Sequence, residues 1–119
     1  MKRDTDPAKL EAFILENLSE MGLGTDEIYA LCSIDIKEKE PALRAFSEKY
    51  RIPVITFEAS ILDRVPGEFS ASEFVKEKTG TDNVCERSAM AAAGSAGHLT
   101  LRKKAKEGMT IAIACRGED

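Results

Sequence analysis

The fold is decided by residues 28–57, which read IYALCSIDIKEKEPALRAFSEKYRIPVITF. The compact apolar run Ile28 to Ile34 is short enough to favour a strand buried on both faces over a helix. Pro41 then opens an amphipathic helix, and Ile52 to Phe57 reads as a strand that is entered through a proline. Strand, helix and strand in this order form a parallel βαβ unit with a right-handed crossover. We therefore predict an α/β protein, a three-layer sandwich in which helices cover both faces of a small mixed sheet.

A second amphipathic helix is predicted ahead of this unit. Asp6 followed by Pro7 has the pattern of an N-cap and a first helical residue, and apolar residues recur at helical spacing until Gly22. A short helical turn is expected at residues 25–27. In such folds the first helix normally follows a first strand, yet here the helix begins almost at the amino terminus.

A hairpin is predicted at the other end of the chain. Two strand-like runs, His98 to Leu101 and Met109 to Cys115, are separated by the charged segment Arg102 to Gly108. Between the βαβ unit and this hairpin, a short helix is expected from Ser60 to Pro66.

Size and composition indicate one globular domain over residues 1–119. The chain is 43% apolar and 32% charged, and its net charge of −4 argues against nucleic-acid or membrane-surface partners. Three cysteines, Cys32, Cys85 and Cys115, form no CxxC pair, so neither a zinc site nor a disulfide framework is predicted. The sequence shows no signal peptide or membrane span, and we expect a cytoplasmic protein with reduced thiols.

The segment Val65 to Arg87 is dense in turn-forming and polar residues, and we expect function to lie there. Ser70 with Glu73 three residues later has the spacing of a capping box, so a helix should begin at that point. Another helix is predicted to open at Cys85 and to run to Ala93. Two neighbouring helix starts would form an anion-binding wall, because each contributes unpaired N–H groups and a partial positive charge.

Four blocks occur in an order that resembles a known family. They are Ser33 to Glu40, Pro66 to Val75, Asn83 to Ala89, and Lys103 to Ala114. Together they resemble the C-terminal domain of the cobalamin-biosynthesis protein CbiG and its stand-alone relative CobE. The resemblance implies a role in building the corrin ring. Proteins similar to CbiG act as cobalt-precorrin-5A hydrolases, which open a δ-lactone and release acetaldehyde, while the CobE relatives belong to the aerobic route.

The sequence departs from the family pattern in three ways. Members usually place a Gly-Ile-Gly-Cys strand before the basic residues that match Lys2 and Arg3, and a proline stands where this chain has Arg102. CbiG proteins also carry additional N-terminal domains. We therefore expect the first strand, which would pair beside the strand at 28–34, to be missing, with its neighbour's backbone groups left open.

Lactone opening needs a base that activates water. Glu73 and Glu86 are the candidates for this catalytic role. Capping alone would also explain Glu73, and a carboxylate in the first turn of a helix favours the helix dipole without catalytic duty. Both interpretations stay open for each glutamate.

The substrate is rich in carboxylates, so cations and hydrogen-bond donors should seat it. Ser72, Arg87 and Lys103 are the candidates, and Lys103 matches the late lysine of the family. Lys103 belongs to the basic run Arg102 to Lys106, and the alternative interpretation of this run is a solvated hairpin without ligand contact. Asp35 and Lys37 follow the first visible strand, at the edge where open α/β sheets bind ligands, and we expect them at the rim of the site.

Two other residue types offer weaker signals. The only histidine, His98, begins a strand and is expected to be structural or at the surface. Cys85, near a helix start, could form a reactive thiolate, but no base adjoins it. No metal site and no cofactor of the protein itself is expected, because cobalt would enter only as part of the substrate.

Three hypotheses follow. The leading one is a cobalamin-pathway domain that binds a cobalt-precorrin and takes part in lactone hydrolysis. The second is a non-catalytic corrinoid-binding or partner module of the CobE type. The third is a small α/β interaction protein whose polar segment only caps helices. Expected partners are the cobalt-precorrin and either other cobalamin-pathway enzymes or the N-terminal domains of CbiG.

Overall fold

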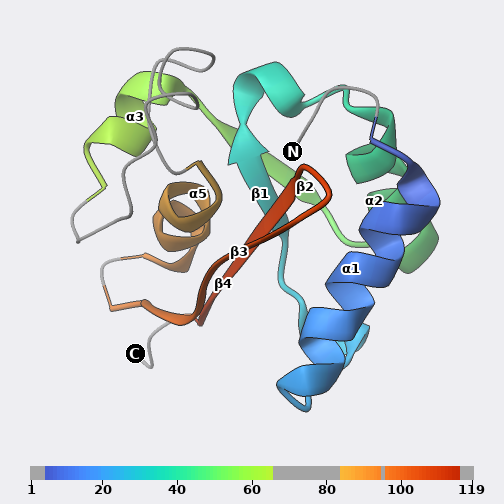
Figure 1. Ribbon diagram of the computed structural model, residues 1–119. Helices are drawn as coiled ribbons and strands as arrows, with labels where there is room; N and C mark the ends of the chain where they lie inside the picture. Colours follow the sequence, from blue (N-terminus) through green and yellow to red (C-terminus); the bar gives the residue numbers. More distant parts are fainter. Residues whose placement is uncertain (1–4, 66–83, 95, 116–119) are drawn as a thin grey trace.

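The computed structural model describes residues 5–65, 84–94 and 96–115, and it confirms the predicted α/β class (Figure 1). Its elements follow one another in the order α1 (Pro7–Glu20), the 3-10 turn η1 (Thr25–Glu27), β1 (Leu31–Ile34), the 3-10 turn η2 (Asp35–Lys37), α2 (Pro41–Tyr50), β2 (Val54–Phe57), α3 (Ala59–Asp63), α5 (Val84–Ala93), β3 (His98–Lys106) and β4 (Met109–Cys115).

The predicted βαβ unit is present. β1 and β2 pair in parallel, with Leu31 opposite Val54 and Ile34 opposite Phe57, and α2 forms the crossover between them. Both strands are shorter than predicted, because the chain becomes regular only at Leu31 and Val54. Of the β1 residues, Ile34 is buried, with 1% exposure, and the rest are partly exposed.

The predicted hairpin is also present, and it is longer than expected. β3 pairs antiparallel with β4 and runs through the charged residues as far as Lys106. Its register shifts twice, between Leu99 and Leu101 and between Leu101 and Lys104, and such shifts mark β-bulges. Charged residues stay in the strand because β3 has an alternating pattern of exposure, with polar side chains on its open face.

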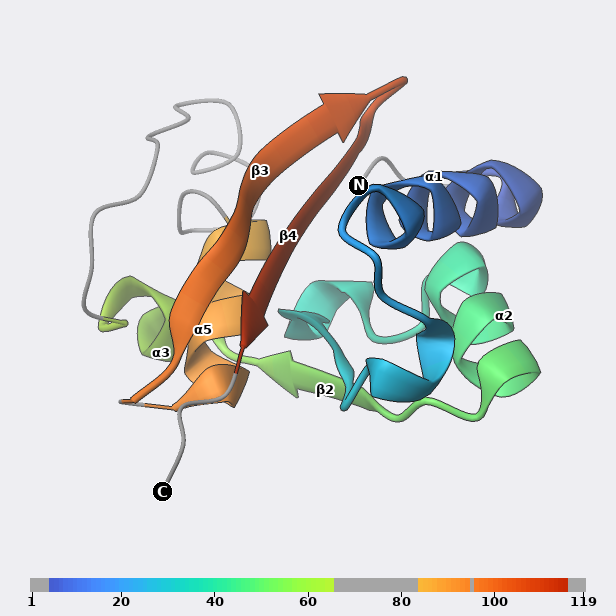
Figure 2. The same cartoon turned by 90° about the horizontal axis from the view of Figure 1, so that it is seen from below.

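The strands form two separate sheets, where a single mixed sheet was expected. Among the described residues, β1 pairs with β2 and β3 pairs with β4, and no pairing joins the two sheets. Both sheets contact α5. On its other side, β4 packs Met109, Ile111 and Ile113 against the core that α1 forms (Figure 2). β4 therefore has helices on both of its faces.

The core follows the apolar periodicity of α1. Leu10, Phe13, Ile14 and Leu18 are all buried, and Asp6 caps the helix by accepting a 2.9 Å hydrogen bond from the N–H of Ala8. These apolar side chains meet those of α2 and β4 in one cluster. None of the helices in the described part of the chain is long and apolar enough to span a membrane.

The hairpin turn gives a test of the fold. Glu107 and Gly108 have φ angles of 50° and 81°, which is typical of a two-residue type I′ turn. Gly108→Ala should lower the free energy of unfolding by about 1–2 kcal/mol, because a Cβ is strained in this conformation. Glu107→Asn should raise it, since Asn tolerates a positive φ better than Glu. Urea denaturation of both variants measures the two effects, and equal midpoints would contradict this turn geometry.

Candidate functional site

Two of the predicted site residues lie outside the described residues. Ser72 and Glu73 belong to the segment 66–83, as does the predicted helix start at Ser70. Their assignments as carboxylate donor and general base therefore stay predictions. The structure describes the other five candidates, which lie on α5, on β3 and after β1.

Glu86 and Lys103 meet where α5 packs against the hairpin. Glu86 lies in the first turn of α5 with 0% exposure, and its Oε2 accepts a 2.7 Å hydrogen bond from the backbone N–H of Lys103. Lys103 belongs to the second bulge of β3, between Leu101 and Lys104. Because a bulge leaves a backbone group outside the strand ladder, the carboxylate takes the place of a strand partner for this N–H.

This geometry favours a structural role for Glu86. A general base must reach water or substrate, whereas the Glu86 carboxylate is enclosed and already holds a backbone donor. A buried carboxylate is stable only when donors surround it, and the Lys103 N–H is one such donor. Glu86 thereby fixes the position of Lys103 relative to the start of α5.

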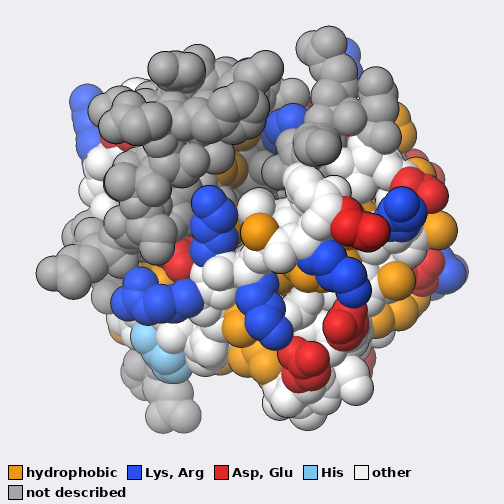
Figure 3. All heavy atoms as spheres, viewed as in Figure 1, with side chains coloured by type: hydrophobic (Ala, Val, Ile, Leu, Met, Phe, Trp, Pro, Cys, Tyr) orange, Lys and Arg blue, Asp and Glu red, His pale blue; other side chains and the backbone are white. Residues whose placement is uncertain are grey.

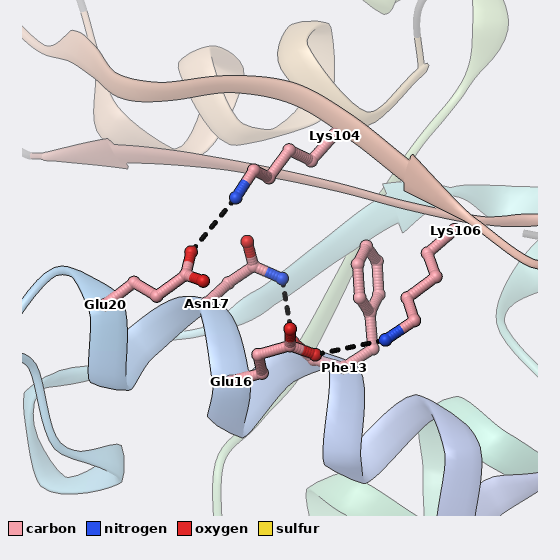
Figure 4. A network of polar contacts seen from close by, with 6 residues as sticks. All are labelled: Phe13, Glu16, Asn17, Glu20, Lys104 and Lys106. Atoms are coloured by element: carbon pink, nitrogen blue, oxygen red, sulfur yellow. Dashed lines mark hydrogen bonds and ion pairs between the residues drawn. The ribbon is translucent and has the colours of Figure 1, made fainter.

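The basic run of β3 is divided between two sides of the hairpin. Lys104 pairs with Glu20 at 3.0 Å and Lys106 pairs with Glu16 at 3.4 Å, so both ammonium groups point toward α1 (Figure 4). Lys103 is half-buried on the side of α5 and lies close enough to Cys85 to affect its pKa. The solvated-hairpin alternative therefore fits Lys104 and Lys106, and Lys103 remains the candidate for substrate contact.

The surrounding surface has mixed charge. Figure 3 shows Lys and Arg side chains over the hairpin, with Asp and Glu side chains beside them on the α1 side. His98 is exposed at the start of β3, which agrees with the surface role expected for it.

Arg87 connects two helices. Its Nη1 donates a 3.1 Å hydrogen bond to the carbonyl oxygen of Leu62, near the end of α3. A cation at this position favours the dipole of α3, and it adds a second donor to a carbonyl that already accepts from the N–H of Val65. Part of the guanidinium is therefore used to hold α3 on α5, and its predicted contact with a substrate carboxylate stays a prediction.

Asp35 and Lys37 form η2, directly after β1. Asp35 is exposed and Lys37 is half-buried. In Figure 1, α5 begins at the same end of the molecule at which β1 ends, so the two predicted groups share one end of the fold. This is the edge at which parallel strands of α/β proteins bind ligands.

Sequence reasoning did not single out Glu40 as a site residue. Glu40 is 8% exposed, and its Oε1 has no hydrogen-bond partner among the described residues. Buried polar atoms are nearly always hydrogen-bonded, so a buried oxygen without a partner is unusual. The available signal was its position: Glu40 ends the family-like block that starts at Ser33, and it directly precedes Pro41.

The half-buried thiols of Cys32 and Cys85 are poor nucleophiles. Burial raises the pKa of Cys32 to about 11. Burial also raises the pKa of Cys85, although a hydrogen bond with Thr110 and the nearby ammonium of Lys103 act in the opposite direction. The alternative of a reactive thiolate at the start of α5 is therefore not supported.

Neither a metal centre nor a ligand-sized hollow beside α1 is found in the described part of the chain. Those residues contain no group of three His, Cys, Asp or Glu side chains that could hold a metal ion. A hollow of about 90 Å³ lies between α1 and the hairpin, beside Phe13 and Lys106. Because ligand pockets usually measure about 300–1,000 Å³, this hollow is too small for a tetrapyrrole.

The structural role of Glu86 can be measured. Glu86→Ala should lower the free energy of unfolding by about 1–3 kcal/mol, because it leaves the Lys103 N–H buried without an acceptor. Glu86→Gln should cost less, since its amide oxygen can still accept. Glu16→Ala, which removes an exposed ion pair, is the control and should change stability by less than about 1 kcal/mol. Urea denaturation separates these variants, and an unchanged midpoint for Glu86→Ala would refute the role.

Thiol labelling tests the environment of the cysteines. Iodoacetamide at pH 8 should modify the exposed Cys115 first, and Cys32 and Cys85 much more slowly, because burial limits access and their raised pKa values keep both thiols protonated. Mass spectrometry identifies the modified sites. In urea, all three should react at similar rates. Equal rates in the native protein would contradict the burial described here.

Comparisons with known proteins agree with the resemblance drawn from the four sequence blocks. Residues 1–114 match the family model for the Cobalamin synthesis G C-terminus. The chain is 30% identical over 112 residues to a cobalt-precorrin-5A hydrolase of Priestia megaterium, covering 94% of this chain and 29% of that protein. It is 25% identical over 114 residues to protein CobE of a Sinorhizobium species, covering 95% of this chain and 74% of that protein. The chain thus spans less than a third of the hydrolase.

Solved structures show the same fold. A crystal structure of CobE, a protein from the cobalamin (vitamin B12) biosynthetic pathway, matches with a TM-score of 0.84 and 31% identity, covering 95% of this chain and 83% of that one. A cobalamin biosynthesis protein G homolog from Sulfolobus solfataricus matches with a TM-score of 0.73 and 20% identity, covering 97% and 34%. The chain therefore belongs to the family of cobalamin synthesis G C-terminal domains, which places it in cobalamin biosynthesis.

Proposed function

We propose that the chain binds a cobalt-precorrin and takes part in the hydrolysis of cobalt-precorrin-5A. The observation that carries this proposal is the placement of Lys103 beside the start of α5, held there by the buried carboxylate of Glu86. The similarity to a cobalt-precorrin-5A hydrolase over 94% of this chain supports it. Cobalt enters as part of the substrate.

The site offers a means of seating a polyacidic ligand. The ammonium of Lys103 and the N–H groups in the first turn of α5 can together hold one substrate carboxylate. Ser72, Arg87 and Lys37 would hold others, and Asp35 would accept hydrogen bonds at the rim. In lactone hydrolysis a base takes a proton from water, the water oxygen bonds to the acyl carbon, the acyl–oxygen bond of the ring breaks, and the departing alkoxide takes up the proton. Acetaldehyde is released only when a carbon–carbon bond next to the resulting alcohol then breaks, with its electron pair left on the macrocycle and the alcohol proton taken by a base. Glu73 and Glu86 are the sequence candidates for the base that activates water.

A second candidate function is a corrinoid-binding module without chemistry of its own. It is favoured by the similarity to CobE, of which the chain covers 74%, and by the burial of Glu86. In this case Lys103 and the N–H groups at the start of α5 would hold the macrocycle for a partner. That partner would be either another pathway enzyme or the domains that precede this one in CbiG.

A titration with cobalt-precorrin-5A tests the proposal. Lys103→Gln should raise Kd about tenfold, the equivalent of about 1.4 kcal/mol, because it removes a cation at the ligand. Lys106→Gln is the matched control on the same strand and should leave Kd within about twofold, since its ammonium pairs with Glu16. Visible absorbance of the corrinoid reports binding, and acetaldehyde release in the same samples reports chemistry.

The outcomes separate the two functions. Binding with acetaldehyde release supports hydrolysis, and binding without release supports the non-catalytic module. Glu73→Gln and Glu86→Gln should each be compared with the unmodified protein, because a general base contributes about 10²–10⁴-fold. If both variants release acetaldehyde at the unmodified rate, neither glutamate is the base. Absence of binding by the unmodified protein would refute both functions.

A further inference from the structure

The helix α3 presents an exposed apolar side chain and an exposed cation on one face. Ile61 is 47% exposed, and it is one of the two large hydrophobic residues that lie at the surface in the described part of the chain. Arg64 follows three residues later, at the C-cap of α3, and it is also exposed. Because residues three apart lie on the same side of a helix, Ile61 and Arg64 form one surface patch.

The interior contacts of α3 hold this patch in place. Leu62 is 0% exposed and anchors the helix in the interior. Its carbonyl oxygen also accepts the 3.1 Å hydrogen bond from Arg87 Nη1, which ties the end of α3 to α5. The guanidinium of Arg64, by contrast, forms no ion pair with any described residue. The fold therefore fixes where this cation stands without using its charge in a described ion pair.

The patch lies at the edge of the sheet where α/β proteins bind their ligands. A single residue separates the end of β2 from the start of α3, and β1 ends at the same edge because the two strands are parallel. Figure 1 shows α3 packed beside α5, whose first turn contacts the hairpin through the bond from the Lys103 N–H to Glu86. The patch thus lies on the α3 side of α5, and Lys103 lies on the hairpin side.

We propose that the face of α3 formed by Ile61 and Arg64 is a further contact surface for the cobalt-precorrin, an inference that rests on the proposed function. A tetrapyrrole combines an apolar macrocycle with carboxylate side chains around its rim. Ile61 offers apolar area to the macrocycle, and Arg64 can hold one carboxylate through two parallel N–H···O bonds. Lys103 would hold a carboxylate at another point of the rim. Together the two cations would set the orientation of the macrocycle over the start of α5.

The opposite edge of the sheet carries matched control residues. Arg51 is likewise an exposed arginine at the C-cap of a helix, but it precedes β2. Tyr29, the other exposed large hydrophobic residue, precedes β1. Single apolar residues and helix-terminal cations are common on protein surfaces, so these two residues show what such exposure alone contributes.

A titration with cobalt-precorrin-5A compares the two edges. Arg64→Gln should raise Kd about tenfold, the equivalent of about 1.4 kcal/mol. Ile61→Gln should raise Kd about threefold, because less apolar area is buried against the ligand. Arg51→Gln and Tyr29→Gln should each leave Kd within about twofold of the unmodified protein, since the carboxyl edge is the ligand edge. Arg64→Lys keeps the charge without the planar fork and should recover part of the loss.

Salt dependence gives a readout that a purely structural role would not change. Added NaCl should weaken binding less in Arg64→Gln than in the unmodified protein, because one contact between a cation and a carboxylate is gone. A Kd and a salt dependence equal to those of the unmodified protein would assign this face to another occupant, such as a partner protein. That result would overturn the inference while leaving the proposed function intact.

Two further results would also overturn the inference. An equal rise in Kd for Arg51→Gln and Arg64→Gln would show that net charge, and not the position on α3, determines binding. If the unmodified protein does not bind cobalt-precorrin-5A, the proposed function fails first, and this inference fails with it.

Discussion

The contact between the Glu86 carboxylate and the Lys103 N–H holds the two halves of the candidate site together. α5 and the hairpin come from separate segments of the chain, and this hydrogen bond joins them in the interior. At the next turn of α5, the buried Ser88 hydroxyl donates to the Val84 carbonyl of the same helix at 2.7 Å and also lies 3.3 Å from the Cys32 carbonyl of β1. α5 thus contacts both sheets, which do not pair with each other in the described residues.

The bulge in β3 explains why neighbouring lysines of one strand face different helices: Lys104 and Lys106 pair with α1, and Lys103 lies on the side of α5. In a regular strand, residues alternate strictly between two faces, and Lys104 and Lys106 share a face that meets the glutamates of α1. The bulge before Lys104 interrupts this alternation. It leaves the Lys103 N–H outside the strand ladder, so that this N–H donates to Glu86 instead. Two lysines thereby pair with glutamates of α1, and a third is left on the side of α5, where a ligand could use it.

Local sequence signals, such as helix caps and the spacing of apolar residues, were sufficient to predict most of the helices and strands. Asp6 and Pro7 start α1 as predicted, and the spacing of Leu10, Phe13 and Leu18 predicts the buried face of that helix. The length of β3 was underestimated, because charged residues on an open strand face look like a loop when the partner strand is unknown. The separation of the two sheets could not be foreseen either, since strand pairing depends on contacts between distant segments. The expectation of an absent strand beside β1 stays a prediction.

The candidate site was less predictable than the fold, because the roles of its acids depend on burial and partners. From sequence, Glu86 looked like a base at a helix start and Glu40 looked like a residue before a proline. In the structure both are buried, but Glu86 has a backbone donor and Glu40 Oε1 has none among the described residues. A satisfied buried carboxylate stabilises an interface, whereas an unsatisfied one is costly unless something else supplies the donor. Burial alone therefore does not give the role of an acid. The hydrogen-bond partner does: Glu86 has a structural role because it holds a backbone N–H, and Glu40 Oε1 holds no such donor among the described residues.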